Sequence, residues 1–446
     1  MTALLPAPPP SPRASRSLHR RWRPLALAAS LLCGSLPALA QTTPASPAAP
    51  AAAAPAASAA SGPTLRAEVG KPLQAAQEAI RAGNHKEALA RLAEAEAMPG
   101  LTPYEVFITQ RLKGPAAFGA GDLATATQVF EQVLASPLLA VADRPAITES
   151  TVKMLLQLKE YPRAASLMKA YLDADGSNAE LRRLYPQVLS VVGDHAGVLR
   201  ELAPQLAADD AARRATPEAT LRMVAASQNA LKDTAGYTAT LERLAATTGK
   251  ADYWSELTAR TARRDGFAEE RLRLDLYRLR RAAGVRLDAG ELGDMAYRAQ
   301  QVGLPAEAQA LLDEGFGSGL LGKDSNALAD QKLREASTRA AAGDRAGLAD
   351  SEAAAQKAKD GNAAINLGLA MSGAGLHERG LALMLQGQAK GGLRRPDDAL
   401  LHLGLVQWRA GKIDDAMRSF EAVKGSDGSA DLARLWRVYL ASVARK

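Results

Sequence analysis

Cysteine is almost absent from this chain of 446 residues: the only one is Cys33, near the N-terminus. Cys33 follows Leu31 and Leu32, where a lipid-attachment site needs a small residue, so we do not expect a lipoprotein. If the N-terminal segment is removed, the remaining chain has no cysteine at all. It then has no disulfide, no thiolate nucleophile and no cysteine-ligated metal site.

Aromatic residues are also scarce, at 4% of the chain, although the hydrophobic fraction is 47%. Much of that fraction is alanine, a strong helix former whose small side chain suits closely spaced helices better than the large cores of β-sheets. No segment shows a convincing alternation of apolar and polar residues typical of a strand. The composition therefore predicts an all-α protein.

Acidic residues are missing from residues 1–40, which contain five arginines. Without those five, the 55 basic side chains of the chain fall to 50 against 48 acidic ones, so the net charge of +7 falls to +2. A nearly neutral mature chain gives no reason to expect nucleic acid as a partner.

The same residues 1–40 are typical of a secretory signal peptide. A basic stretch ends at Arg23, an apolar run extends from Leu25 to Leu36, and small residues at Ala38 and Ala40 precede Gln41. The run is about a dozen residues, whereas a membrane span needs roughly 20. We expect cleavage after Ala40 and a periplasmic protein without a membrane span, with an uncleaved anchor as the alternative.

Residues 41–63 consist almost wholly of Ala, Pro, Ser and Thr. The prolines interrupt any helix and there are no large side chains to bury, so this segment is predicted to be a disordered linker.

After the linker, one pattern recurs with intervals of 32 to 40 residues, which is typical of solenoids. We take as turn markers Gly83, Gly121, Lys159, Gly193, Lys232, Asp265, Gly303, Gly343, Gly375 and Gly411. Five residues after a marker there is usually a small residue, such as Ala126 or Ala416, and four residues later a larger apolar one, such as Phe130 or Phe420. A small residue lets two helices approach closely and the larger one fills the groove between them. Residues 64–428 are therefore predicted to form about ten helical hairpins.

Helix boundaries support these hairpins. Thr102 to Glu105 forms a capping box with proline at the first helical position, while Thr216-Pro217 and Arg395-Pro396 open helices in the same manner. Glycine at many markers suits a left-handed residue that ends one helix before the next begins.

Residues 64–446 resemble an array of tetratricopeptide repeats. The unit from Leu400 to Val423 is the most similar, and the units at Gly121 and Gly375 are fair matches. The units at Gly193, Lys232, Asp265 and Gly343 depart from the pattern, because they carry Val198, Tyr237, Glu270 and Leu348 where a small residue is expected. The resemblance implies a right-handed α-solenoid whose first helices line a concave groove for protein or peptide partners.

The C-terminal residues 429–446 are predicted to form a capping helix. Apolar residues from Leu432 to Val443 recur at spacings of three and one, which makes a single helical stripe. A terminal repeat needs such a helix to cover its open apolar face.

The stretch from Gly317 to Lys323 matches most of a phosphate-binding loop, but such a loop needs a strand before it. Residues Pro305 to Glu314 have the spacing of a helix instead. We therefore predict that the stretch links two hairpins, as a softer hinge of the solenoid, and that the protein binds no nucleotide cofactor.

Other candidate sites are weak. His85, His195, His377 and His402 are scattered without metal-binding spacing, and no catalytic serine motif occurs, so we expect neither a metal nor an enzyme. The arginines at 263–264 and 278–281 are interpreted as solvated helix faces balanced by nearby acidic residues, with a polyanion-binding patch as the alternative.

We therefore predict an exported scaffold that binds protein or peptide partners in a cell-envelope assembly. The alternative is an accessory protein of polysaccharide export or outer-membrane machinery that contacts glycan, although the scarcity of aromatic residues argues mildly against sugar. The predicted groove mixes basic, amide and aromatic groups, which suits polar or acidic segments. Its predicted residues are Arg111, Lys153, Gln157, Arg183, Gln187, Arg222, Asn229, Tyr297, Gln300 and Trp408.

Overall fold

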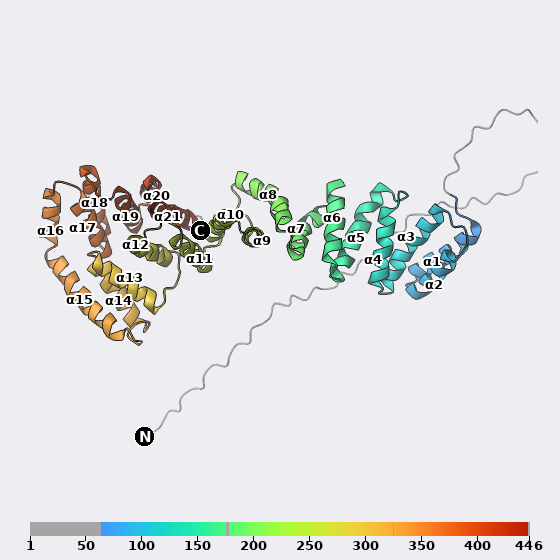
Figure 1. The fold of residues 1–446 in the computed structure, drawn as a ribbon, viewed down its shortest axis with the longest axis horizontal. Coiled ribbons are helices and arrows are strands. Elements are labelled where there is room, and N and C mark those ends of the chain that lie inside the picture. Colours follow the sequence, from blue (N-terminus) through green and yellow to red (C-terminus); the bar gives the residue numbers. More distant parts are fainter. Residues whose placement is uncertain (1–63, 175–177, 324, 445–446) are drawn as a thin grey trace, which may run out of the picture. The chain divides into compact units, whose positions relative to one another are not determined.

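The computed structural model describes residues 64–174, 178–323 and 325–444, so the predicted signal peptide and linker lie outside it. The described residues form helices without any strand (Figure 1). The helices are α1 Ala67–Arg81, α2 His85–Glu96, α3 Pro103–Gly119, α4 Leu123–Ala135, η2 Val141–Asp143, α5 Arg144–Gln157, α6 Tyr161–Ala174, α7 Ala179–Val192, α8 His195–Ala211, α9 Glu218–Ala230, α10 Thr234–Thr248, α11 Ala251–Ala262, α12 Glu269–Ala282, α13 Ala289–Gln301, α14 Pro305–Gly317, α15 Ala327–Ala346, α16 Leu348–Lys357, α17 Asn362–Gly373, α18 His377–Lys390, α19 Pro396–Arg409, α20 Ile413–Ala422 and α21 Ser429–Val443.

Each helix packs on the next along the chain, most closely within pairs such as α1 and α2, α3 and α4, α17 and α18, and α19 and α20. These pairs are helical hairpins, and each hairpin also packs on the one that follows it. The predicted fold class, an all-α solenoid of stacked helical hairpins, is confirmed.

The turns inside the hairpins form where the sequence predicted them. Eight of the ten markers have a positive φ, at values from 59° to 84°. At Gly121, for example, the backbone N–H of Asp122 donates to the carbonyl of Ala117 at 2.9 Å, and that of Gly121 donates to Phe118 at 3.0 Å. This left-handed turn satisfies carbonyls at the end of α3, and the Asp122 side chain then accepts from Thr125 to begin α4.

The other two markers were misplaced. The left-handed residue after α11 is Gly266, not Asp265, and Gly343 lies inside α15, which continues to Ala346. Alanine-rich sequence around Gly343 favours helix, and one glycine in a helix costs only about 1 kcal/mol, so the helix is not interrupted there.

The predicted packing inside the hairpins is also observed. Ala126 and Ala416 are fully buried, and so are Phe130 and Phe420 to within 5%. Phe420 lies so close to Gly404 of the facing helix that a Cβ at that glycine would come within 2.7 Å of the ring. Small residues thus allow the two helices of a hairpin to approach, as the spacing predicted.

Two parts of the described chain differ in how their cores are built. In the N-terminal arm, α1 to α9, buried residues form successive separate clusters. In the closed part, α10 to α21, one large cluster extends from Leu241 to Leu440, beside a small one between α16, α17 and α18. The reason is that α21 packs on α10 and α12 as well as on α19 and α20. The C-terminal helix, expected to cover the last hairpin, therefore also joins helices nearly 200 residues earlier in the sequence.

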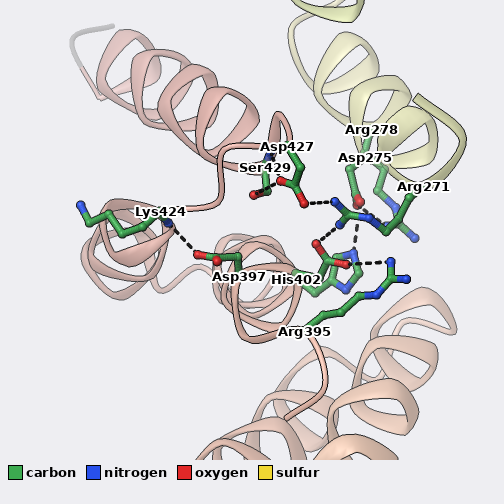
Figure 2. A network of polar contacts seen from close by, with 10 residues as sticks. Arg271, Asp275, Arg278, Arg395, Asp397, His402, Lys424, Asp427 and Ser429 are labelled. Carbon is green, nitrogen blue, oxygen red and sulfur yellow. Dashed lines mark hydrogen bonds and ion pairs between the residues drawn. The ribbon is translucent and has the colours of Figure 1, made fainter. Parts of the chain in front are cut away.

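Ion pairs and a backbone hydrogen bond hold the same junction. Arg271 of α12 pairs with Asp398 of α19 and with Asp427 in the link before α21 (Figure 2). The N–H of Ala268 donates to the carbonyl of Asp427 at 2.8 Å. Nearer the end of the chain, Arg434 of α21 pairs with a glutamate of α10.

Aromatic rings gather where α21 returns. Trp436 is 1% exposed, with ring centroids 4.9 Å from Trp408, 5.7 Å from Phe420 and 5.8 Å from Tyr439. Trp254 of α11 meets Tyr439 edge-on at 6.1 Å. These five rings join α11, α19, α20 and α21.

Within the described residues, no helix combines the length and the apolar character needed to cross a membrane.

Candidate protein-binding surface

Six of the predicted groove residues lie exposed on three consecutive first helices, which are the first members of their hairpins. They are Lys153 and Gln157 on α5, Arg183 and Gln187 on α7, and Arg222 and Asn229 on α9. The opposite sides of these helices carry buried, mostly apolar residues. On each helix a cation is followed by an amide one or two turns later, which places both on one face. We call these six residues the polar face of the arm.

The cations of the polar face are weakly engaged. Lys153 pairs with Glu149, and Arg183 pairs with Glu180 at 2.9 Å, each within one helix and with exposed side chains. Such exposed pairs contribute little to stability and are readily exchanged for another carboxylate. Arg222 makes no ion pair within the described part of the chain, because its neighbour Glu218 is already bound to Lys250 at 2.6 Å.

The positive charge in this region lowers the pKa of Glu218. Hydrogen bonds from Lys250 and Tyr253 hold the pKa of Glu218 below its usual value, and the charge of Arg222 adds to that effect. The carboxylate therefore stays ionised and fixes the start of α9 against α11. Arg222 is left with its guanidinium toward solvent.

Arg111, the predicted residue on α3, lies differently from the six. Its Nη2 donates to Asp143 at 2.8 Å, and both side chains are about two-thirds buried or more. This pair ties α3 to η2, the short helix that precedes α5. Arg111 therefore serves the stacking of two hairpins and is less free to meet a partner.

The remaining three predicted residues, Tyr297, Gln300 and Trp408, lie on helices of the closed part and not on the arm. Tyr297 of α13 is 53% exposed, while Gln300 on the same helix is half-buried. The expectation for Trp408 needs correction: its ring packs on Trp436 and Tyr439, so it belongs to the aromatic junction with α21. The sequence predicted a helix over the last hairpin but not that Trp408 lies on the side of α19 that this helix covers.

Tyr297 lines a hollow of about 590 Å³ between α13 and α15. The walls are mostly small or apolar, including Gly290 and Gly293 on α13 and Ala329 and Leu333 on α15. The carboxylate of Asp294, at the edge, is held by Arg298 at 2.9 Å and by the Tyr277 hydroxyl at 3.0 Å.

A second group of charged residues is buried between α12, α14 and α19. Arg278 is 4% exposed and donates to Asp275 at 2.7 Å and to Glu307 at 2.6 Å. Arg409 donates to Glu307 at 3.1 Å. His402 meets Asp275 at 3.2 Å, as Figure 2 shows. The expectation that Arg278 lies on a solvated helix face was wrong, because α14 and α19 cover it.

Burial and pairing oppose each other in this network. Burial alone would raise the pKa of Glu307, but the charges of Arg278 and Arg409 lower it to about 2. Burial likewise opposes ionisation of Asp275, and the charges of His402 and Arg278 hold its pKa well below the usual range. The network of Arg278, Arg409, Asp275 and Glu307 links three hairpins.

The alternative of a polyanion-binding patch loses its support. Beside the buried Arg278, three arginines of the two runs are bound to carboxylates of neighbouring helices, while Arg263 is exposed. These pairs are Arg264 with Asp431, Arg280 with Glu291 and Arg281 with Glu314.

The glycine stretch is the exit of a helix, as predicted. Helix α14 continues to Gly317, and the N–H of Leu320 donates to the carbonyl of Gly315 at 2.9 Å to close it. Gly319 and Gly322 have φ values of 69° and 83°. Helix α15 begins at Ala327, after Asp324, which is not described. A phosphate loop would need a strand where α14 stands.

The four histidines of the described chain lie in different hairpins, and in that part no three His, Cys, Asp or Glu residues gather as metal ligands would. His377 meets the Ser372 hydroxyl at 3.1 Å within the turn between α17 and α18.

One feature of the arm was not foreseen from the sequence. Large apolar side chains are exposed at the ends of four consecutive first helices: Phe118, Leu158, Val191 and Leu231. We call these four residues the apolar row. The available signal was their position one to three residues before a turn marker, where helix exits leave side chains open to solvent.

The sequence matches no protein-family profile and no curated protein. Among solved structures, it is similar to Naa15/Naa10 bound to HypK-THB, with 12% identity over 82% of this chain and a TM-score of 0.31; the chain spans 65% of that protein's length. It is also similar to the human IFIT1 dimer with m7Gppp-AAAA, with 16% identity over 86% of this chain and 84% of that one, and a TM-score of 0.21. It is similar to the P58(IPK) TPR domain as well, with 14% identity over 83% of this chain and 98% of that one, and a TM-score of 0.22.

Proposed function

We propose that this protein is a non-enzymatic scaffold that holds a segment of a partner protein on the polar face of its arm. The observation that carries the proposal is the repetition of one exposed cation and one exposed amide on three consecutive first helices. Repeated groups on a preformed surface allow many modest contacts to add up without a large ordering cost.

The chemistry of the polar face suits a polar or acidic segment. Lys153, Arg183 and Arg222 offer charge-assisted hydrogen bonds to carboxylates. The amides of Gln157, Gln187 and Asn229 each offer two donors and one acceptor, which match the N–H and C=O groups of an extended backbone.

We further propose that the protein works in the periplasm as part of an envelope assembly. This part rests on the secretory pattern of residues 1–40 and the linker composition of residues 41–63. A flexible linker would let the solenoid reach partners some distance from its site of release.

Site-specific photocrosslinking in living cells tests the scaffold. A photoreactive amino acid is placed at Gln157, Gln187 or Asn229 of the full chain, and the adducts are digested with protease or with glycosidase. We expect the same protease-sensitive protein adduct from all three positions. Because the positions share one face, adducts that differ among them would contradict a single binding surface.

Matched controls are exposed positions on second helices, Lys86 of α2, Lys169 of α6 and Arg200 of α8. These positions should give little adduct. Equal yields from both sets would refute the polar face as a binding surface. Adducts sensitive only to glycosidase would support the glycan alternative instead.

A further inference from the structure

Three residues of the apolar row lie at the C-terminal ends of the helices that carry the polar face. Leu158 directly follows Gln157, Val191 stands four residues after Gln187 on α7, and Leu231 follows Asn229 by two residues. Since neighbouring helices run in alternating directions, all turns from a first to a second helix lie at one edge of the array. The row therefore follows that edge, at the ends of the helices that carry the polar face.

The exposure of these side chains is uncommon for this part of the chain. Among the described residues of α1 to α10, seven large apolar side chains are exposed, and four of them make up the apolar row. Leu158 is 37% exposed, Leu231 47% and Val191 61%. Single exposed apolar residues need no explanation, but four at the C-terminal ends of successive first helices are consistent with a surface that a partner covers.

The positive charge of the polar face indicates the kind of partner segment that would bind. The cations of the polar face have only weak same-helix pairs or, for Arg222, none in the described chain, so they favour carboxylates. The adjoining apolar row favours large apolar side chains that leave water on binding. A purely acidic segment would leave the row exposed, and a purely apolar one would leave the cations without partners.

We propose that the partner segment carries carboxylates interspersed with large apolar residues, the carboxylates meeting Lys153, Arg183 and Arg222 and the apolar side chains covering Leu158, Val191 and Leu231. This inference rests on the proposed function and adds the sequence character of the partner. The segment crosses α5, α7 and α9 in an extended form, so that one chain reaches both sets of residues.

Three synthetic peptides test this specificity by fluorescence anisotropy with the full chain. The first consists of four Glu-Leu-Gly-Ser repeats, the second replaces Glu by Gln, and the third replaces Leu by Ser. We expect the first to bind at least about tenfold more tightly than either of the others. Equal binding of the first and third peptides would overturn the role of the apolar row.

Variants assign the contacts. Leu158→Gln, Val191→Gln and Leu231→Gln together should reduce binding of the first peptide about tenfold, to the level of the third peptide. The matched control changes Leu376, Leu385 and Ile413 to Gln, because these residues of the closed part are exposed to a similar degree, 37% to 48%. That control should leave binding unchanged, and an equal loss in both variants would overturn the inference.

The charge-reversed variant, Lys153→Glu with Arg183→Glu and Arg222→Glu, should lose both acidic peptides and keep the weak binding of the Gln peptide. Failure of this inference differs from failure of the scaffold. If crosslinking finds one partner on the polar face but neither acidic peptide binds, the inference is overturned and the scaffold stands. If the peptides bind as expected but cells yield no shared protein adduct, the scaffold proposal fails instead.

Discussion

Replacing Trp436 by alanine should loosen the whole closed part, because this side chain anchors α21, the helix that joins the two ends of that part. Trp436 is 1% exposed and contacts the rings of Trp408, Phe420 and Tyr439. It stands on α21, which packs on α10 and α12 as well as on α19 and α20.

The expected loss of stability follows from the buried area. A buried tryptophan removes about 200 Å² or more of surface from water, which at about 25 cal/mol per Å² corresponds to about 5 kcal/mol. Alanine retains part of that surface, while the cavity left behind adds a cost, and measured values for such changes are about 3–5 kcal/mol. We expect a loss of about 4 kcal/mol in the free energy of unfolding of the closed part.

Hydrogen exchange with mass spectrometry locates the effect, and urea unfolding followed by circular dichroism measures it. Peptides from α10, α12 and α19 to α21 should lose protection together, while those from α1 to α7 keep theirs. The control, Val443→Ala on the same helix, changes a side chain that is 48% exposed and should shift stability by less than about 0.5 kcal/mol.

The alternative is that α21 only covers the last hairpin. In that case, protection would fall in α19 and α20 alone, and α10 and α12 would exchange as in the unaltered chain. Such a result would refute the reasoning. If the alanine variant does not fold, Trp436→Phe retains a ring and should show the same pattern with a smaller shift.

Other changes probe the buried network, the turns and the hairpin packing. Glu307→Gln should cost about 3–5 kcal/mol, because it leaves Arg278 buried with one carboxylate fewer. The pKa of Glu307 is lowered from 4.5 to about 2, so its stabilisation is complete above pH about 4.5 and is lost as the pH falls toward 2. Urea midpoints at pH 7 and pH 3 should therefore fall less steeply in the variant than in the unaltered chain. Gly121→Ala should destabilise and Lys159→Gly should stabilise, each by about 1 kcal/mol, because both residues have a positive φ; equal signs in urea unfolding would contradict the turn assignment. Ala416→Leu should cost about 1–3 kcal/mol by overpacking a fully buried position, and a neutral result would contradict the assigned packing.

The polar face illustrates how far a helical repeat can be read without a structure. The spacing of Lys153, Gln157, Arg183 and Gln187 from their turn markers placed them on exposed faces, because a helix fixes the direction of a side chain relative to its neighbours. The same reasoning failed for Trp408. Its exposure depended on whether another helix covers α19, and the residues around position 408 do not encode that.

What the sequence determined by itself is local: the helices, the left-handed turns between them and the pairing of small with large side chains inside each hairpin. Each of these depends on residues within about one repeat, so the pattern repeats in the sequence as it does in space. The misplaced marker at Gly343 shows the limit, since alanine-rich sequence favours helix whether or not a turn is expected.

Only the tertiary structure decided that the chain returns on itself. Arg271 pairs with residues 127 and 156 positions later, and Arg434 with one 192 positions earlier. Such contacts depend on the angles between successive hairpins, summed over α10 to α21, and small differences in side-chain packing set each angle. A sequence pattern that describes one hairpin at a time cannot predict the sum of these angles.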